Sequence, residues 1–154
     1  MKLTVATQQH IPTLMAWFPN EQAFSLWSGP GFRYPFTEQT FIDDLKLSTL
    51  SSYALLNENS EIIAFGQFYL RMNRCHLARL AVKPSERGKG IATVLIQKLG
   101  EIGCKLLNSN ELSLFVFSHN TSAARAYQKL GFVLAQYSEP MPIENCVYMI
   151  KKNN

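Results

Sequence analysis

The sequence has 154 residues, of which 47% are hydrophobic and 12% aromatic, so it is not intrinsically disordered, a state that requires low hydrophobicity. The length is typical of a single domain, residues 1–154, with a core of its own. The formal charge of +4 suits an anionic ligand, but the basic residues form no stripe, and we therefore expect no nucleic-acid partner.

The N-terminal third begins with a short predicted strand, Leu3–Ala6. A helix is predicted at His10–Phe18, because its apolar residues recur at helical spacing. Pro19–Phe36 is predicted as a loop. Thr37 is predicted to cap a second helix.

The predicted loop is rich in aromatic residues and includes Trp27, Phe32 and Tyr34. Such a loop either packs on the core or forms a wall of a substrate site, and the sequence leaves both interpretations open.

Three strands follow in the middle of the chain, at Ser52–Leu56, Ile62–Leu70 and Cys75–Val82. Polar turns at Asn57–Ser60 and Met72–Arg74 separate them. The third strand ends at Lys83-Pro84, because proline lacks a backbone donor for the strand ladder.

The longest predicted helix is Ile91–Leu107. It includes Gly100 and Gly103, each of which costs about 1 kcal/mol relative to alanine, and only close packing would explain them. One apolar stripe is predicted along it, made of Ile91, Leu95, Leu99, Ile102 and Leu106.

The C-terminal part is predicted as a strand at Glu111–Phe117, a helix at Ser122–Leu130 that stops at Gly131, and two closing strands at Phe132–Tyr137 and Cys146–Lys151. The strand–helix–strand unit from Cys75 to Phe117 should be parallel with a right-handed crossover. The fold class is therefore mixed α/β: a central, mostly antiparallel twisted sheet of about seven strands with one parallel βαβ unit, flanked by about four helices.

The segment that carries chemistry joins the third strand of the middle group to the long helix. It reads Arg87-Gly88-Lys89-Gly90 directly before Ile91. The N-terminus of a helix offers unpaired N–H groups and a partial positive charge, and glycine lets the backbone approach an anion closely. Together with the two cations, this pattern predicts a cradle for a diphosphate.

Two common phosphate-binding loops do not match this segment. A Walker loop requires serine or threonine after Gly-Lys, where this chain has Gly90. A dinucleotide-binding loop requires a third small residue, where this chain has Thr93, and a tighter turn from strand to helix.

The sequence instead resembles the GCN5-related N-acetyltransferase (GNAT) superfamily, whose acyl-CoA loop reads Gln/Arg-x-x-Gly-x-Gly/Ala. The matching run is Arg87 to Ala92, and a second run, Asn120 to Phe132, continues the resemblance. The resemblance implies a GNAT-like fold and assigns to the acetyl-CoA site Leu80, Ala81, Val82, Arg87, Gly88, Lys89, Gly90, Ile91, Ala92, Asn120, Ala123 and Tyr127.

Each part of this set has an implied role. The main chain of Leu80–Val82 would pair with pantetheine, and Gly88–Ala92 with Arg87 would hold the pyrophosphate. Asn120 would lie near the cofactor arm, and the Tyr127 hydroxyl would protonate the departing sulfur. A phenol with a pKa of about 10 is protonated at neutral pH and can act as that acid.

Simpler interpretations of these residues stay open. Tyr127 could be a core residue, Asn120 only a helix cap, and Arg87 and Lys89 a solvated loop. Arg79 is either a surface cation or faces the acceptor.

The implied function is an acetyl-CoA-dependent N-acetyltransferase that acts by direct amine attack on the thioester in a ternary complex, with strand N–H groups holding the oxyanion. The acceptor would be a primary amine of a small molecule or a protein N-terminus. Its binding residues would include Trp27, Phe32, Tyr34 and Arg79. The alternative is a non-catalytic acyl-CoA-binding or sensing module.

The sequence leaves the identity of the general base open. Some family members have a glutamate on the strand before the asparagine, but Leu112–Phe117 contains no carboxylate. Water could relay the proton instead, with help from His119, His76 or Glu21.

Cys75, Cys104 and Cys146 are widely spaced and lack clustered histidines, so we expect neither a disulfide framework nor a metal site. The chain has no long uncharged apolar stretch, and its N-terminus turns polar too early for a signal peptide. We therefore expect a cytoplasmic protein without membrane contact, as a monomer or homodimer.

Overall fold

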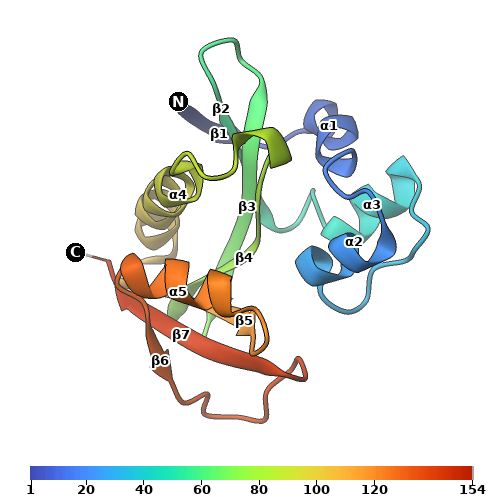
Figure 1. Cartoon of the computed structure of the whole chain (residues 1–154). Coiled ribbons are helices and arrows are strands. Elements are labelled where there is room, and N and C mark those ends of the chain that lie inside the picture. Colours follow the sequence, from blue (N-terminus) through green and yellow to red (C-terminus); the bar gives the residue numbers. More distant parts are fainter. Residues whose placement is uncertain (154) are drawn as a thin grey trace. The chain divides into compact units, whose positions relative to one another are not determined.

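The structure, a computed structural model, describes residues 1–153. Seven strands form one sheet in the order β1-β2-β3-β4-β5-β7-β6 (Figure 1). The strands are β1 (Lys2–Val5), β2 (Ser51–Leu56), β3 (Ile62–Arg71), β4 (Arg74–Val82), β5 (Glu111–Phe117), β6 (Val133–Ala135) and β7 (Cys146–Lys152). The helices are α1 (Ile11–Met15), α2 (Glu21–Ser28), α3 (Glu38–Leu45), α4 (Ile91–Leu107) and α5 (Thr121–Lys129), and short 3-10 turns lie at Gln8–His10 and Pro84–Glu86.

The described chain forms two compact units. The first contains residues 1–68 and 79–99, and the second contains residues 69–78 and 100–153. The strands β3 and β4 and the helix α4 each contribute residues to both units.

In the first unit, β2 pairs antiparallel with both β1 and β3. The helices α1, α2 and α3 lie together beside β3 (Figure 1) and bury apolar side chains against it. The fully buried members of this core include Ile11, Leu14, Phe24, Phe41, Leu45 and Phe65. Thr37 caps α3 by accepting a hydrogen bond from the backbone N–H of Thr40, which confirms the predicted start of that helix.

The helix α2 corrects the prediction of a loop over Pro19–Phe36. The Asn20 side chain accepts a hydrogen bond of 2.9 Å from the N–H of Ala23, which caps the helix. Phe24 and Ser28 are both buried, one turn apart on the same side. Gly29 ends the helix with a φ of 70°. The prolines and glycines that indicated a loop therefore flank a helix of eight residues.

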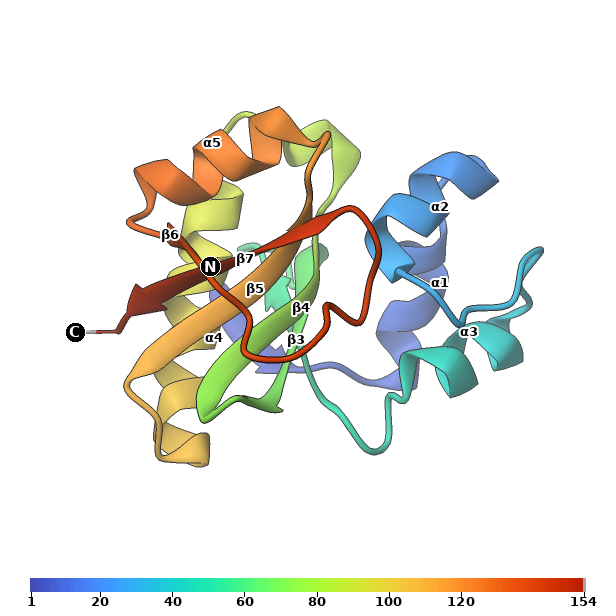
Figure 2. The same cartoon turned by 90° about the horizontal axis from the view of Figure 1, so that it is seen from below.

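In the second unit, β7 pairs antiparallel with β5 and with β6. The strand β4 pairs parallel with β5, through Cys75 opposite Leu112 and His76 opposite Ser113, which confirms the predicted parallel pair. Figures 1 and 2 show α5 along one side of β5 and β7, and the chain between β6 and β7 on the other side.

Two predictions for the C-terminal half need correction. β6 covers only Val133–Ala135, because the N–H of Phe132 bonds to the carbonyl oxygen of Tyr127 at the end of α5 and Tyr137 leaves the sheet. Leu106 was predicted as the last member of the buried stripe on α4, but it is 62% exposed and does not belong to the buried side of the helix. The buried side of that helix turns instead to Gly100, Gly103 and Cys104. A Cβ at Gly100 would lie 3.0 Å from Leu112 Cδ1, so close packing on β5 explains this glycine.

No helix within residues 1–153 has the length and apolar character needed to cross a membrane. The same residues contain no group of three or more His, Cys, Asp or Glu side chains that could hold a metal ion. Cys75 and Cys104 are buried thiols, and burial raises the pKa of Cys75 to about 12.

Candidate functional site

The loop that follows β4 has the backbone geometry expected of an anion cradle. Gly88 and Gly90 both have a φ of 78°, which side chains other than glycine rarely adopt. A Cβ built at either position would meet no atom within 4 Å, so open space surrounds both glycines. The backbone conformation therefore requires these two glycines, and it leaves the main chain accessible.

The helix α4 begins directly after this loop. Its first hydrogen bond runs from the N–H of Val94 to the carbonyl oxygen of Gly90, at 3.4 Å. The N–H groups of the first helical turn lack partners within the helix, and the helix dipole adds a partial positive charge there. The start of α4 therefore fits a negatively charged phosphate group.

Close packing at Gly66 lets α4 lie close to β3. A Cβ at this position would lie 2.7 Å from Leu99 Cδ2 and 2.9 Å from Leu80 Cδ2. Only glycine allows the helix to approach the strand this closely without a shift of these side chains.

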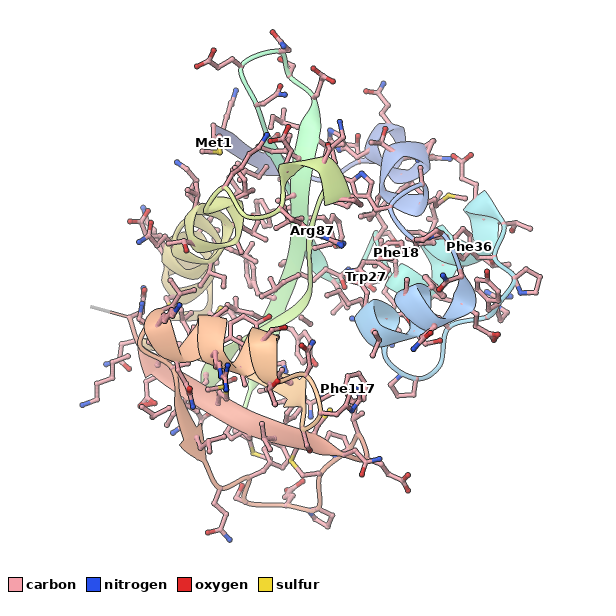
Figure 3. All side chains as sticks on the ribbon, viewed as in Figure 1. Met1, Phe18, Trp27, Phe36, Arg87 and Phe117 are labelled. Carbon is pink, nitrogen blue, oxygen red and sulfur yellow. The ribbon has the colours of Figure 1, made fainter. Side chains whose placement is uncertain are left out.

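The two cations of the loop are in different states. Arg87 is exposed and extends from the loop (Figure 3). Lys89 is also exposed, but its Nζ lies 3.1 Å from Glu86 Oε2. Exposed ion pairs contribute at most about 1 kcal/mol, so a bound phosphate could displace Glu86. Arg87 thus presents its positive charge to solvent, whereas the positive charge of Lys89 is partly balanced by the Glu86 carboxylate.

The strand β4 is irregular directly before Leu80–Val82. Arg79 lies inside the strand with a φ of 51°, which is rare for a residue with a side chain. Such an irregularity bends a strand and changes where the following residues point. The indole Nε1 of Trp27 donates a hydrogen bond of 2.8 Å to the carbonyl oxygen of Arg79. The helix α2 therefore holds β4 at the position where it bends.

The side chain of Arg79 is held as well. Its Nη1 donates to Gln67 Oε1 at 3.1 Å, and its Nε donates to the carbonyl oxygen of Ser28 at 3.3 Å. Its guanidinium carbon lies 5.1 Å from the centre of the Phe32 ring. Arg79 is therefore neither a simple surface cation nor a mobile one.

Three of the four predicted acceptor residues come together in the first unit. Trp27 and Phe32 pack edge to face at 6.1 Å, and both contact Arg79. Trp27 also stacks on Phe18 at 4.5 Å (Figure 3). Tyr34 lies apart from this group: it contacts Phe24 and is 41% exposed.

In the second unit, α5 carries the residues assigned to the cofactor arm. Asn120 caps the helix, because its Oδ1 accepts a hydrogen bond of 3.3 Å from the N–H of Ala123. Tyr127 is half-buried and packs edge to face on Phe132 at 5.9 Å. Burial raises the pKa of the Tyr127 phenol, so the hydroxyl keeps its proton at neutral pH.

The candidate bases occupy very different surroundings. His76 is only 2% exposed, and its Nδ1 lies 2.8 Å from Ser113 Oγ. Burial and, to a smaller extent, the charge of Arg71 lower the pKa of His76 to about 3. His119 is exposed and stacks on Phe117, with the ring centres 5.5 Å apart, and Glu21 is exposed in the first turn of α2.

Comparison with known proteins identifies the family. Residues 15–132 match the acetyltransferase (GNAT) family. The chain belongs to this family. An uncharacterised N-acetyltransferase of Methanocaldococcus jannaschii is 36% identical over 81 residues, which cover 50% of this chain and 51% of the relative. One of Bacillus subtilis is 42% identical over 48 residues, covering 31% and 30%. The matches thus span about half of one of these curated relatives and about a third of the other.

Solved structures with the same fold cover nearly the whole chain. The spermidine N-acetyltransferase of Vibrio cholerae in complex with CoA and spermine superposes with a TM-score of 0.74 at 17% identity, over 99% of this chain and 95% of that one. The PaiA N-acetyltransferase of Thermoplasma acidophilum in complex with CoA has a TM-score of 0.73 at 18% identity, over 98% of both chains. At this level of identity the likeness shows the fold.

The structure adds residues that the sequence analysis did not single out. Gln67 is fully buried and bonds to Arg79, Ser52 and the carbonyl oxygen of Leu45. The signal for it was a polar amide inside an otherwise apolar predicted strand, Ile62–Leu70. Arg71 and Tyr137 had no comparable signal, because 66 residues separate them in sequence.

Proposed function

We propose that this chain is an acetyl-CoA-dependent N-acetyltransferase that transfers an acetyl group to a primary amine. The observation that carries the proposal is the loop at Gly88 and Gly90, with two positive φ angles directly before the 17-residue α4. It lies within the residues that match the acetyltransferase family. The proposal keeps the expectation of a single domain.

Acetyl-CoA would supply the electrophile, an acetyl thioester. The N–H groups of Gly88–Ala92 and the Arg87 side chain would bind its pyrophosphate. The main chain of Leu80–Val82 would pair with pantetheine. Asn120 and Ala123 would lie along the cofactor arm.

Tyr127 would donate a proton to the sulfur as the bond to the acetyl group breaks. The raised pKa of its phenol supports this role, because the acid must carry its proton before the reaction. The carbonyl of the acetyl group would accept hydrogen bonds from N–H groups of β4, where negative charge develops during amine attack.

Water would carry the proton away from the attacking amine. A base that works at neutral pH needs a pKa near that pH, whereas the pKa of His76 is about 3 and its ring is buried. His119 remains a candidate for the last step of the relay, because it is exposed.

The acceptor would be an amine of a small molecule or a peptide N-terminus, near Trp27, Phe32 and Arg79. Spermidine is the substrate in the name of one structurally similar protein, which makes polyamines one class to test. The proposal includes a cytoplasmic location and a monomeric or homodimeric state, to be checked by cell fractionation and by size-exclusion chromatography with light scattering.

The decisive experiment is an assay of CoA thiol release with a panel of amines, combined with calorimetry of acetyl-CoA binding. Acetylation of any amine above the rate of thioester hydrolysis supports the enzyme. Tight acetyl-CoA binding without acetylation of any amine would favour the alternative, a non-catalytic acyl-CoA-binding module. Absence of binding would contradict both.

A further inference from the structure

A cluster of aromatic side chains in the second unit surrounds one arginine. Arg71 lies at the end of β3, and its guanidinium carbon is 5.4 Å from the centre of the Tyr69 ring and 5.2 Å from that of Phe115. Its Nη1 donates a hydrogen bond of 2.9 Å to the hydroxyl oxygen of Tyr137. We call Tyr69, Arg71, Phe115 and Tyr137 the Arg71 cluster.

The cluster holds the guanidinium in a fixed orientation. Tyr137 belongs to the chain between β6 and β7, which crosses the open side of β5 (Figure 2). Its ring packs edge to face on Phe115 at 5.4 Å and on Tyr148 at 5.0 Å. Ser138 Oγ also lies 3.5 Å from Met72 Sδ, beside the turn that follows Arg71. A planar guanidinium held between rings is already oriented for a planar partner.

The positive charge of Arg71 has no negative partner within residues 1–153. The ion pairs of that part of the chain are Arg33 with Asp44, Arg74 with Glu111, and Lys89 with Glu86. Arg71 Nε is buried, and no described residue accepts a hydrogen bond from it. A buried donor without an acceptor is costly, so this one calls for an explanation. The charge also acts on the neighbouring His76, where it helps to lower the pKa.

The side chains of the cluster are only partly covered by the rest of the protein. Tyr69, Arg71, Phe115 and Tyr137 are all partly exposed, whereas His76 and Tyr148 beside them are buried. The cluster is therefore a partly open surface with a buried floor, rather than a closed core.

The position of Phe115 relates the cluster to the proposed reaction. Side chains alternate along a strand, and Leu112 on β5 packs toward Gly100 of α4. Ser113, Phe115 and Phe117 therefore point to the opposite face of the sheet. The same strand leads to Asn120, the residue proposed for the cofactor arm. An acceptor bound at the cluster would lie along this face of β5.

We propose that the Arg71 cluster binds the carboxylate of the acceptor, so that the acceptor is an amino acid or a peptide-like amine and not a polyamine. This inference rests on the proposed acetyltransferase function. A carboxylate can accept hydrogen bonds from the two Nη groups of a guanidinium, and in Arg71 these are the donors left for a ligand because Nε is buried. Its single negative charge matches the one positive charge of the cluster. A phosphate would need a second cation, and the neighbouring Arg74 is already paired with Glu111. A polyamine would be repelled by Arg71.

The test compares amines that differ only in the carboxylate. The pairs are methionine with 3-(methylthio)propylamine and phenylalanine with phenethylamine, with spermidine as the polyamine and O-phosphoethanolamine beside β-alanine as the phosphate arm. We expect kcat/KM to be at least ~10-fold higher for the carboxylate member of a pair, mainly through a lower KM. A preference for spermidine, for phosphoethanolamine or for the decarboxylated amines would overturn the proposal while leaving the acetyltransferase function intact.

Variants of Arg71 and Arg74 test whether Arg71 causes the preference for carboxylates. Arg71→Gln should remove the preference for carboxylates, and Arg71→Lys should restore only part of it, because an ammonium lacks the planar pair of donors. Arg74→Gln is the matched control, since it removes a cation from the same unit whose partner is already Glu111. It should keep the preference. A preference that survives in Arg71→Gln, with circular dichroism showing that the variant is folded, contradicts the proposal.

A binding measurement separates this inference from the proposed reaction. N-acetylmethionine has a carboxylate but no reactive amine, so calorimetry can follow its binding without turnover. Binding to the wild type that weakens at least ~10-fold in Arg71→Gln and not in Arg74→Gln supports the carboxylate site even if no amine is acetylated. Equal binding to the wild type and Arg71→Gln, or none to either, overturns it whatever the activity assay shows.

Discussion

Trp27 Nε1 donates a hydrogen bond of 2.8 Å to the carbonyl oxygen of Arg79, the residue at which β4 adopts a φ of 51°. The bond joins α2 to the strand directly before Leu80–Val82, the segment proposed to pair with the cofactor. The aromatic residues of the N-terminal part thus have a second role besides packing, because one of them fixes the main chain of β4.

Trp27→Phe should weaken acetyl-CoA binding roughly 3- to 10-fold, because it keeps an aromatic ring but removes the donor to Arg79, a change of about 1 kcal/mol. Trp17→Phe is the control, since Trp17 is buried and its Nε1 has no partner within residues 1–153. It should lower the free energy of unfolding in urea without changing the affinity. Equal affinity losses in both variants would mean that the effect is general packing.

Arg87→Glu should weaken acetyl-CoA binding at least ~10-fold, or about 1.4 kcal/mol, because it reverses the charge beside the proposed phosphate cradle. Arg87 is exposed, so the fold should tolerate the change. Lys2→Glu on β1 makes the same change in net charge at another exposed position and should bind normally. Gly90→Glu should also weaken binding, although its φ of 78° adds strain. Isothermal titration calorimetry measures all three, and unchanged affinity in folded Arg87→Glu and Gly90→Glu would exclude this loop as the site.

Tyr127→Phe should lower turnover roughly 10- to 1000-fold, the usual range for a lost proton transfer. The ring and its contact with Phe132 remain, so acetyl-CoA affinity and the melting temperature should hardly change. Steady-state kinetics, calorimetry and thermal melting measure the three quantities. Full turnover in this variant would mean that Tyr127 is a packing residue and that the thiolate receives its proton elsewhere.

His119→Ala should change turnover less than 10-fold if water relays the proton of the amine, because a true general base contributes roughly 100- to 10,000-fold. The same limit applies to His76→Gln, provided that it folds. The rate should be measured between pH 6 and 9, the range in which an acceptor amine begins to lose its proton. A larger loss in His119→Ala, together with a shifted pH profile, would identify His119 as the base.

The free energy of unfolding should decrease as the pH falls from 6.5 toward 3. In this window the unfolded chain binds a proton at His76, whereas the folded state, with a pKa of about 3 at this residue, does not. The slope that one such residue contributes is at most about 1.4 kcal/mol per pH unit. His76→Gln replaces the imidazole with an amide, which can still hydrogen-bond to Ser113 but does not titrate, and it should flatten this slope. His119→Gln at an exposed position should not. Urea unfolding between pH 7 and 4.5 tests the difference, and identical slopes in the wild type and His76→Gln would refute it.

Local patterns in the sequence were sufficient for the elements that carry the proposed cofactor loop. The predicted bounds of α4 and β5 agree with the structure, because the helical period and the following apolar strand are long and uninterrupted. The unusual backbone conformation of the loop was also indicated by its glycines, because few other residues tolerate the φ angles found there. The parallel pairing of β4 with β5 followed from the strand–helix–strand order.

The tertiary structure alone decided which side chains meet. The helix α2 was not predicted from the sequence, because prolines and glycines dominate its flanks and its buried face appears only when Phe24 packs against α1 and α3. Trp27 and Arg79 are 52 residues apart, and Arg71 and Tyr137 are 66 apart. Helical and strand periods describe neighbours within one element, so they determine which face of that element is buried, but contacts between distant elements depend on how the whole sheet is assembled. The sequence left open whether Arg79 is a surface cation or faces the acceptor, and its contacts with Gln67, Ser28 and Phe32 arise from that assembly, as does the absence of an ion pair at Arg71 within residues 1–153.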